Sequence, residues 1–291
     1  MKPSAFELIR TSSLEEALRA LREHQDRDAK LLAGGQSLIP MMNFRVAQPE
    51  ILIDLGAVPG LDGIEMRDGA LCIGAMTRHN DVKEHALVAQ HAPLVREAYE
   101  YVAHHSIRNR GTLGGNLSHA DPASEMPAVM LALDAVFMVR SVDAERAIPA
   151  SEFFLAPFTT ALEPDEMLLQ VRIPAALAQE RFAFEEVSLR KGDFAISAVA
   201  AGLRMRDGRC ERARVSMSGI SYTPLRAAEA EEVLAGEVPD AGCIARAVDA
   251  AVGAIEFNAT AAITAEYRRD LTRTLMIRAL SRAAAEPSET P

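Results

Sequence analysis

Two short glycine-rich segments carry the residue types best suited to hold a phosphate group. They read Ala33-Gly34-Gly35-Gln36-Ser37 and Thr112-Leu113-Gly114-Gly115-Asn116. A glycine pair lets the backbone approach a bulky group closely, and small polar side chains can donate hydrogen bonds. Each segment precedes a stretch that can start a helix, so backbone N–H groups and a helix dipole could converge on an anion. Two such turns in one chain predict a diphosphate held from two sides.

The common nucleotide motifs are missing from the sequence. No G-x-G-x-x-G follows a strand, and no G-x-x-x-x-G-K-[ST] occurs, so the usual nicotinamide and mononucleotide sites are not supported. The ligand must then be bound through two separated loops. This arrangement suits an elongated dinucleotide such as FAD, lying between two subdomains with its pyrophosphate between the turns.

Composition limits the class of protein. The chain has 291 residues, a net charge of −10 and 49% hydrophobic residues, which predicts a globular protein without general affinity for nucleic acid. No apolar run reaches the roughly 18 residues of a membrane span, and the first residues lack a secretory signal. We therefore expect a cytoplasmic protein with no membrane span.

The three cysteines, Cys72, Cys210 and Cys243, are widely separated in the sequence. They fit no metal spacing and cannot supply four iron–sulfur ligands. We predict no metal site and read these cysteines as small residues in a reducing compartment.

The elements that must position the glycine turns can be read from patterning. A capping box, Ser13-x-x-Glu16, predicts a helix, and strands at 29–32 and 51–55 flank a helix at 37–42 as a small parallel unit. From about residue 61 a larger mixed unit begins with a hairpin around Asp68-Gly69. Its further elements are expected as helices at 77–85, with Thr77 as the cap, 90–103 and 125–133, and strands at 135–140 and 168–174.

The remainder of the chain is predicted to form a separate unit. Asp207-Gly208 marks a hairpin between strands at 195–205 and 209–219. Three helices are expected to follow, at about 226–234, 241–255 and 265–285.

Longer strings around the two turns resemble a known family. Residues 32–40 and 107–117, together with Asp121-Pro122-Ala123, are similar to the FAD-binding medium subunit of molybdenum hydroxylases, the xanthine dehydrogenase and carbon monoxide dehydrogenase flavoprotein family. The resemblance covers essentially the whole chain and includes the Arg190–Ala195 segment. It implies an α+β fold with a two-subdomain FAD-binding domain of the p-cresol methylhydroxylase/vanillyl oxidase type, followed by a small C-terminal domain of sheet plus helices. We expect these domains at 1–176, with subdomains 1–57 and 58–176, and at 177–291.

The resemblance also implies an FAD site, and it implies no catalytic residue. The expected cofactor-binding residues are Leu32, Ala33, Gly34, Gly35, Gln36, Ser37, Leu38, Ile107, Gly111, Thr112, Gly114, Gly115, Asn116, Ser118, Asp121, Leu169, Lys191 and Phe194.

Four of these positions have individual expectations. Asp121 matches a position near the ribityl and isoalloxazine portion, although it could instead be a helix N-cap. Leu169 matches a strand position beside the flavin edge, with plain core packing as the alternative. Phe194 aligns with an aromatic residue that covers the flavin face. Lys191 could stabilise anionic reduced flavin, contact a partner or lie in a solvated loop.

Several other polar residues near the second turn are left open. His104 and His105 have no neighbouring nucleophile at a spacing that would indicate a catalytic pair. His119 could have a flavin-site or a structural role. Arg108 and Arg110 could serve the flavin pocket or a subunit interface.

The functional expectation is an FAD-carrying electron-transfer subunit. Its implied partners are a molybdopterin-bearing large subunit, a small subunit with [2Fe-2S] clusters and an external electron acceptor. Two alternatives remain open at this point: a self-contained FAD-dependent reductase of the same flavin fold, and a scaffold that keeps the fold without the flavin.

Overall fold

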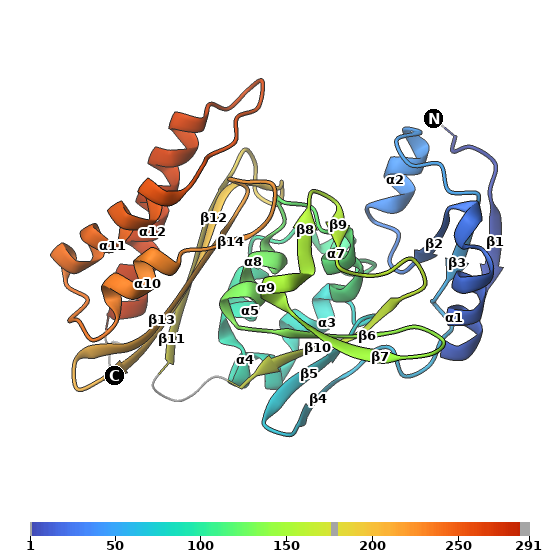
Figure 1. The fold of residues 1–291 in the computed structure, drawn as a ribbon, viewed down its shortest axis with the longest axis horizontal. Coiled ribbons are helices and arrows are strands. Elements are labelled where there is room, and N and C mark those ends of the chain that lie inside the picture. Colours follow the sequence, from blue (N-terminus) through green and yellow to red (C-terminus); the bar gives the residue numbers. More distant parts are fainter. Residues whose placement is uncertain (1, 176–179, 286–291) are drawn as a thin grey trace. The chain divides into compact units, whose positions relative to one another are not determined.

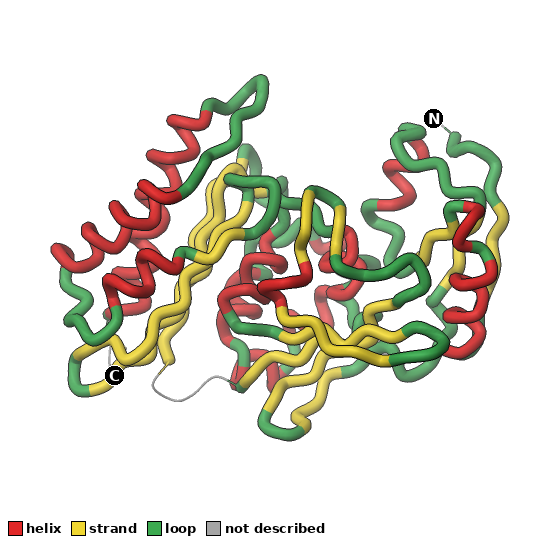
Figure 2. The backbone as a smooth tube through the Cα atoms, viewed as in Figure 1, coloured by secondary structure: helices red, strands yellow, loops and turns green. Residues whose placement is uncertain are grey.

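The computed structural model describes residues 2–175 and 180–285 (Figures 1 and 2). Its contacts divide the chain into two compact units, each assembled from separate segments of sequence. The first unit comprises Met1–Leu87, His104–Ala120 and Ala135–Pro174, and the second comprises Val88–Ala103, Asp121–Asp134 and Ala175–Pro291. The expected boundary between residues 176 and 177 lies outside the described residues. The division into domains at 1–176 and 177–291 therefore stays a prediction.

A small parallel sheet in the first unit precedes the first glycine-rich turn. Strands β1 (Glu7–Arg10), β2 (Ala29–Leu32) and β3 (Ile51–Asp54) pair in the order β1-β3-β2, all parallel. The parallel pairing of β2 and β3 is confirmed, whereas β1 was not predicted because its mostly exposed residues show no buried pattern. Helix α1 (Leu14–Glu23) packs Leu18 and Leu21 against this sheet.

The expected cap of α1 is present. The Ser13 hydroxyl accepts a hydrogen bond from the Glu16 N–H at 3.2 Å, and the Glu16 carboxylate accepts one from the Ser12 N–H at 2.8 Å. The bond from the Ser12 N–H, together with one from the Ser12 hydroxyl, lowers the pKa of the Glu16 carboxyl, because both stabilise its charged form. Two donors at the helix start are thereby satisfied.

A five-stranded antiparallel sheet also belongs to the first unit. Its order is β4-β5-β10-β6-β7, and the strands are β4 (Ile64–Arg67), β5 (Ala70–Gly74), β10 (Met167–Pro174), β6 (Val136–Arg140) and β7 (Glu145–Pro149). The predicted hairpin between β4 and β5 is confirmed, and both turn residues, Asp68 and Gly69, have positive φ, as a two-residue hairpin requires. The mainly exposed β7 was not predicted.

Short elements connect these sheets. They are η1 (Gln25–Arg27), α2 (Leu38–Asn43), α3 (His79–Glu84), α4 (Ala86–His91), α6 (His105–Arg108), α7 (Leu113–His119), α9 (Ala150–Phe153), β8 (Phe154–Ala156) and β9 (Thr159–Thr160).

The second unit is built on an antiparallel sheet of order β11-β12-β13-β14. Its elements are β11 (Glu180–Ser188), β12 (Ala195–Arg206), β13 (Arg209–Ser218), β14 (Leu225–Arg226), α5 (Pro93–Ala98), α8 (Glu125–Ala132), α10 (Ala228–Leu234), α11 (Ala241–Ala254) and α12 (Ala265–Ala284). The predicted hairpin and the three C-terminal helices are confirmed, and β11 was not predicted.

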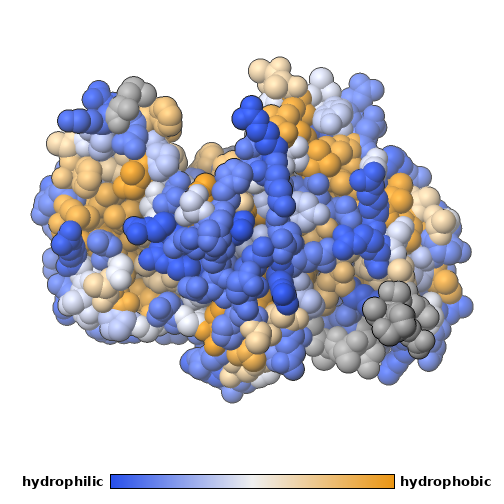
Figure 3. Space-filling model, turned by 180° about the vertical axis from the view of Figure 1, so that it is seen from behind, coloured by the Kyte–Doolittle hydropathy of each residue, from blue (hydrophilic) through white to orange (hydrophobic). Residues whose placement is uncertain are grey.

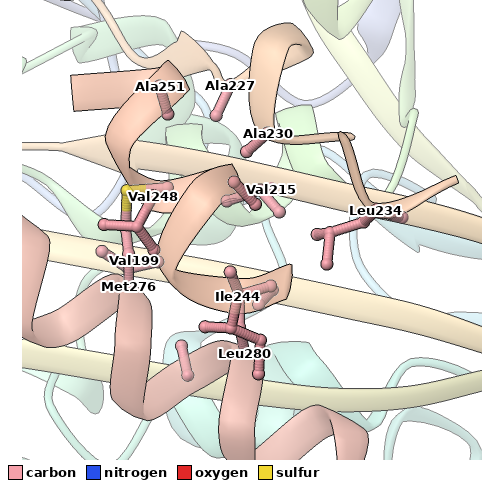
Figure 4. Close-up of a cluster of buried hydrophobic side chains, with 14 of the residues drawn as sticks. Val199, Val215, Ala227, Ala230, Leu234, Ile244, Val248, Ala251, Met276 and Leu280 are labelled. Carbon is pink, nitrogen blue, oxygen red and sulfur yellow. The ribbon is translucent and has the colours of Figure 1, made fainter. Parts of the chain in front are cut away.

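Both faces of this sheet are covered. On one face Val199 of β12 and Val215 of β13 pack with Val248 of α11 and with Met276 and Leu280 of α12 (Figure 4). On the other face α8 lies against β12 and β13, and α5 lies against β11. The mixed α+β class is therefore confirmed.

Two local predictions are wrong. The N-cap of α3 is Arg78, because the Thr77 hydroxyl is used elsewhere: it accepts from the Gly63 N–H at 3.0 Å. The single helix expected at 90–103 is instead two helices, α4 and α5. The break falls at Ala92, because Pro93 lacks an N–H and begins a new helix.

Hydrophilic side chains prevail on the face of the molecule shown in Figure 3, and hydrophobic ones form separate patches. Within residues 2–175 and 180–285, no helix combines the length and apolar character that crossing a membrane requires.

Candidate functional site

The two glycine-rich turns lie side by side in the first unit. A Cβ atom added at Gly34 would lie 2.7 Å from the Cα of Gly111 and closer still to the carbonyl oxygen of Arg110. A Cβ added at Gly115 would lie 3.4 Å from the Cβ of Ala33. Residues 76 to 82 positions apart are therefore in contact, as the diphosphate hypothesis requires.

The first turn offers unused hydrogen-bond donors. Within the described chain, the N–H groups of Gly34, Gly35, Gln36 and Ser37 donate to no protein atom. Gly35 has φ +70°, a left-handed conformation that favours glycine. Consecutive free N–H groups around such a residue form an anion-binding concavity.

Ser37 does not cap helix α2 with its side chain, although it stands at the N-cap position. Its half-buried hydroxyl is available to a ligand together with the free N–H groups of the same turn.

The second turn uses its backbone donors within the protein. The Gly115 N–H donates to the Thr112 hydroxyl at 3.1 Å, and the Gly114 N–H donates to the Ala75 carbonyl at 2.9 Å. The N–H groups of Leu113 and Asn116 are also taken. The glycine pair lies inside the first turn of α7 and Thr112 is 2% exposed, so what this turn can offer a ligand directly is side chains such as Ser118.

Gly114 is required by packing. A Cβ at this position would lie 2.7 Å from both the Cα and the carbonyl oxygen of Ala75. Ala75 also donates its N–H to the Leu169 carbonyl at 2.8 Å, at the point where the register of β10 shifts. Leu169 is thereby tied through Ala75 to the second turn, and its side chain packs against the core around α1.

His79 packs against Gly111, the residue that precedes the second turn. Its N–H donates to the Gly111 carbonyl at 3.0 Å, and a Cβ at Gly111 would lie 2.8 Å from the His79 ring. The ring is 5% exposed, and burial together with the charges of Arg108 and Arg78 lowers the pKa of His79 to about 4. The imidazole is therefore neutral at physiological pH.

A polar network fixes the segment that leads into the second turn. Asn80 receives a hydrogen bond from the Arg108 Nε at 3.0 Å, lies 3.0 Å from His105 Nδ1 and donates to the Asn109 side chain. The Arg78 guanidinium donates to the Arg110 carbonyl. His105 and Arg108 thus have structural roles in holding this segment.

The remaining histidines near the turn differ in setting. His104 occupies the N-cap of α6 without a side-chain capping bond and is exposed. The His119 ring lies at the end of α7 and packs on Phe158 with 5.1 Å between ring centres. Ile107, one of the predicted site residues, is exposed on α6.

Three predicted site residues belong to the second unit. Asp121 accepts a hydrogen bond from the Ala123 N–H at 2.9 Å, while Ser124 is the N-cap of α8, so the alternative of Asp121 as the N-cap is excluded. Lys191 is exposed in the tight turn between β11 and β12. Phe194 ends that turn with a side chain that is 56% exposed, which leaves its ring available for stacking.

Glu125 is a buried acid that the sequence patterns did not reveal. It is 3% exposed, and burial, with a contribution from the charge of Asp121, raises its pKa to about 7. The signal that could have found it is a single acid beginning a helix whose other residues are all apolar.

A separate cavity of about 540 Å³ opens in the first unit beside β4, β5 and β10. Leu169 lines it, but the residues of the two glycine-rich turns do not. Its charged residues include both signs, Arg67 and Arg172 with Glu65 and Glu145, so it has no clear preference for a charged ligand.

Comparison with known proteins assigns a family to both parts of the chain. Residues 4–176 match the model of the FAD binding domain in molybdopterin dehydrogenase, and residues 182–283 match the CO dehydrogenase flavoprotein C-terminal domain. The 6-hydroxypseudooxynicotine dehydrogenase complex subunit alpha of Paenarthrobacter nicotinovorans is 40% identical over 97% of this chain and 96% of its own length.

Two further relatives extend this likeness. The carbon monoxide dehydrogenase medium chain of Hydrogenophaga pseudoflava is 35% identical over 98% of this chain and 99% of its own length. A chain of the quinoline 2-oxidoreductase structure from Pseudomonas putida 86 superposes with a TM-score of 0.93 at 36% identity, covering 98% of each chain.

Proposed function

Because the chain belongs to the FAD-binding flavoprotein family of the molybdopterin dehydrogenases, an oxidoreductase family, we propose that it carries electrons between partner subunits and an external acceptor. In this proposal FAD receives electrons from [2Fe-2S] clusters on a small subunit. A large subunit bearing molybdopterin oxidises the substrate.

The observation that carries the proposal is the contact between the two turns, with four free N–H groups on one of them. A diphosphate needs donors of this kind, and Gly34 to Ser37 present them from one loop. The side chains of Asn116 and Ser118 would complete the site from α7, and Thr112 would hold the turn in shape through its bond with the Gly115 N–H. FAD supplies the redox chemistry when bound, and the protein supplies its binding, orientation and electrostatic surroundings.

The remaining site residues would act on the rest of the cofactor. Asp121 would accept hydrogen bonds from ribityl hydroxyls, since only one of its oxygens is engaged by the Ala123 N–H. Phe194 would stack on the isoalloxazine, and Lys191 would stabilise negative charge on it. Leu169 would present backbone beside the flavin edge. The chain would divide into an FAD domain at 1–176 and a C-terminal domain at 177–291, in keeping with the two family-model matches.

The names of the relatives support a division of labour between subunits. They refer to 6-hydroxypseudooxynicotine, carbon monoxide and quinoline. Carbon monoxide has nothing in common with the other two, which contain a pyridine ring, yet each relative matches this chain over nearly its full length. Two of them are named as one subunit or chain of a larger enzyme. Substrate selection would therefore reside on the molybdopterin subunit. We also propose that the complex works in the cytoplasm.

Purification of the tagged chain from its native host tests the proposal. We expect two further subunits to co-elute, with flavin absorption, iron–sulfur absorption and about one FAD per chain. Addition of an electron acceptor to the reduced complex should reoxidise the flavin. A yellow single chain that oxidises NADPH without partners would contradict the proposal and favour a self-contained reductase; a colourless complex would favour a scaffold without flavin.

A further inference from the structure

Two carboxyl groups of the second unit, Glu125 on α8 and Glu186 on the sheet face that α8 covers, have no basic partner among the described residues. Glu186 of β11 pairs in register with Ala198, which pairs with Ser218 of β13, so these three side chains share one face of the sheet. Helix α8 covers that face, because the Ser216 hydroxyl donates to the Ala128 carbonyl at 2.6 Å. One turn earlier on α8 stands Glu125.

Two hydrogen bonds show where Glu125 lies along strand β13. Ser216 lies at the level of Ala128, and the Gly219 N–H donates to the Pro122 carbonyl at 2.8 Å. Ser218 lies between these two levels, which is where Glu125 begins the helix. Only the methyl group of Ala198 stands between Glu186 and Ser218, so the polar atoms of this row face one another across a small residue.

Polar atoms in this row lack partners. The Oε2 atom of Glu186 and the hydroxyl of Ser218 are buried, and neither has a hydrogen-bond partner within the described residues. Glu125 and Glu186 form no ion pair there. Glu125 accepts hydrogen bonds from its own N–H and from the Ser124 hydroxyl, but burial outweighs these bonds, and burial also disfavours the charge of Glu186. A buried carboxylate without a donor is costly, whereas a protonated carboxyl can donate to a neighbouring carboxylate.

Other charged groups on the described parts of the packed elements do not supply a counterion. Arg214, on the same face of β13 as Ser216 and Ser218, pairs with Glu180 and Asp134. Arg282 of α12 is engaged by Glu97 of α5 and by Glu185, which lies on the opposite face of β11 from Glu186. Tyr101 packs its ring on Phe184, and its hydroxyl is neutral because burial and the nearby carboxylates raise its pKa. Asp121, next to Glu125, adds further negative charge.

We propose that Glu125 and Glu186 share one proton at neutral pH, and that loss of this proton weakens FAD binding. The proposal rests on the proposed function, in which Asp121 holds the ribityl chain. The loop of Asp121 is tied to the sheet by the Gly219 N–H and by the Ala195 N–H, which donates to the Ala123 carbonyl at 3.2 Å. A doubly ionised pair would place a second negative charge beside Asp121 and beneath this loop.

The pKa values agree with this picture. Burial raises the pKa of Glu125 to about 7, and burial with the charge of Glu125 raises the pKa of Glu186 to about 8. Two carboxyls that interact in this way titrate as a pair. FAD binds whenever at least one of the two carboxyls is protonated, so its dissociation constant is constant at and below neutral pH and rises above pH 8.

The test is the pH dependence of FAD affinity in the full apo chain, followed by quenching of flavin fluorescence between pH 6 and 9.5. For the wild type we expect Kd to rise about tenfold per pH unit above pH 8, as linkage to one proton requires. Glu186→Gln should keep its pH 7 affinity up to pH 9.5, because the amide cannot ionise. Glu185→Gln, the neighbour on the opposite face, should retain the wild-type pH dependence.

A flat wild-type profile, or a Glu186→Gln variant with the wild-type slope, would overturn the proposal. Infrared spectroscopy of the apo chain gives an independent readout that needs no FAD. We expect a protonated-carboxyl C=O band at pH 7 that is lost when Glu125 and Glu186 are both replaced by Gln; its absence in the wild type would refute the shared proton. If the chain binds no FAD at any pH, the proposed function fails while the infrared band still decides whether the proton is shared.

Discussion

Gly34 of the first turn and Gly111 of the segment before α7 touch through their backbones. The space that a Cβ of Gly34 would occupy is filled by the Cα of Gly111, 2.7 Å away, and by the Arg110 carbonyl. The contact joins a turn rich in free N–H groups to the start of a helix. It is the physical basis for treating two distant sequence motifs as one diphosphate site.

Replacing Gly34 with alanine should separate the two turns. The added methyl cannot fit against backbone atoms, so we expect a loss of about 1–3 kcal/mol in stability and at least a tenfold weaker affinity for FAD. Chemical denaturation and flavin fluorescence measure the two effects.

The matched control is Gly253→Ala. Gly253 lies in α11, and a Cβ added there would have no neighbour within 4 Å. This change should leave FAD affinity unchanged and raise stability by up to about 1 kcal/mol, since alanine favours helix. Equal FAD affinity in Gly34→Ala and the wild type would show that contact between the turns is not needed for binding.

His79 should be neutral well below the usual pH of histidine titration. Its folded pKa of about 4 lies below the unfolded value of about 6.5, so the unfolded chain binds the proton more readily. The stability that His79 contributes is complete above pH 6.5 and is lost, by at most about 1.4 kcal/mol per pH unit, as the pH falls toward 4.

Urea denaturation between pH 7 and 4.5 measures this loss, and histidine NMR measures the pKa directly. His79→Gln should have a shallower acid limb than the wild type, whereas His104→Gln, at an exposed histidine, should not. A His79 resonance that titrates near pH 6.5 would contradict the buried, neutral imidazole.

Phe194→Ala should change flavin behaviour more than stability. The side chain is 56% exposed, so its removal costs little packing, but a stacked ring alters the surroundings of the isoalloxazine. We expect a shifted flavin potential or reoxidation rate with FAD affinity changed less than about threefold. Potentiometry and stopped-flow reoxidation measure these traits; if neither changes, Phe194 has no contact with the flavin.

Asp134 should be important for the stability of the second unit. Its carboxylate lies 2.8 Å from both Arg212 and Arg226 and 3.3 Å from the buried Arg214. Asp134→Asn keeps the shape and tolerates the left-handed backbone, but leaves three guanidinium groups without this charge. We expect a loss of about 1–3 kcal/mol in denaturation experiments.

Asp249→Asn is the control for this prediction. Asp249 pairs with Arg273 at an exposed site, where ion pairs contribute little, and the expected change is below about 1 kcal/mol. Similar losses in the two variants would mean that the Asp134 network adds nothing beyond a surface pair.

The sequence predicted the elements whose signals are local. The capping box at Ser13, the turn residues Asp68-Gly69 and the apolar periodicity of α11 each report their own segment. The edge strand β1 was not predicted, because its residues are mostly exposed and show no alternation of buried and exposed side chains. The division of 90–103 into two helices was also missed, although Pro93 marks it.

Some features of the candidate site could also be read from the local sequence, whereas others depend on the tertiary structure. Gly34 and Gly114 were noticed for their lack of side chains, but their immediate reasons, the backbones of Arg110 and Ala75, lie elsewhere in the sequence. The N–H groups of the second turn donate to Ala75, Thr77 and Thr112, and these bonds depend on the tertiary structure. The burial of His79 and Glu125 likewise follows from packing, which no local pattern reports.

The most direct test of the central claim compares FAD, FMN and riboflavin binding to the full apo chain by fluorescence titration. Only FAD carries the diphosphate that the two turns are proposed to hold, and each hydrogen bond to a charged oxygen contributes about 1.5–3 kcal/mol. We predict that FAD binds at least about 100-fold more tightly than FMN or riboflavin. Riboflavin binding as tightly as FAD would contradict a diphosphate site at the paired turns.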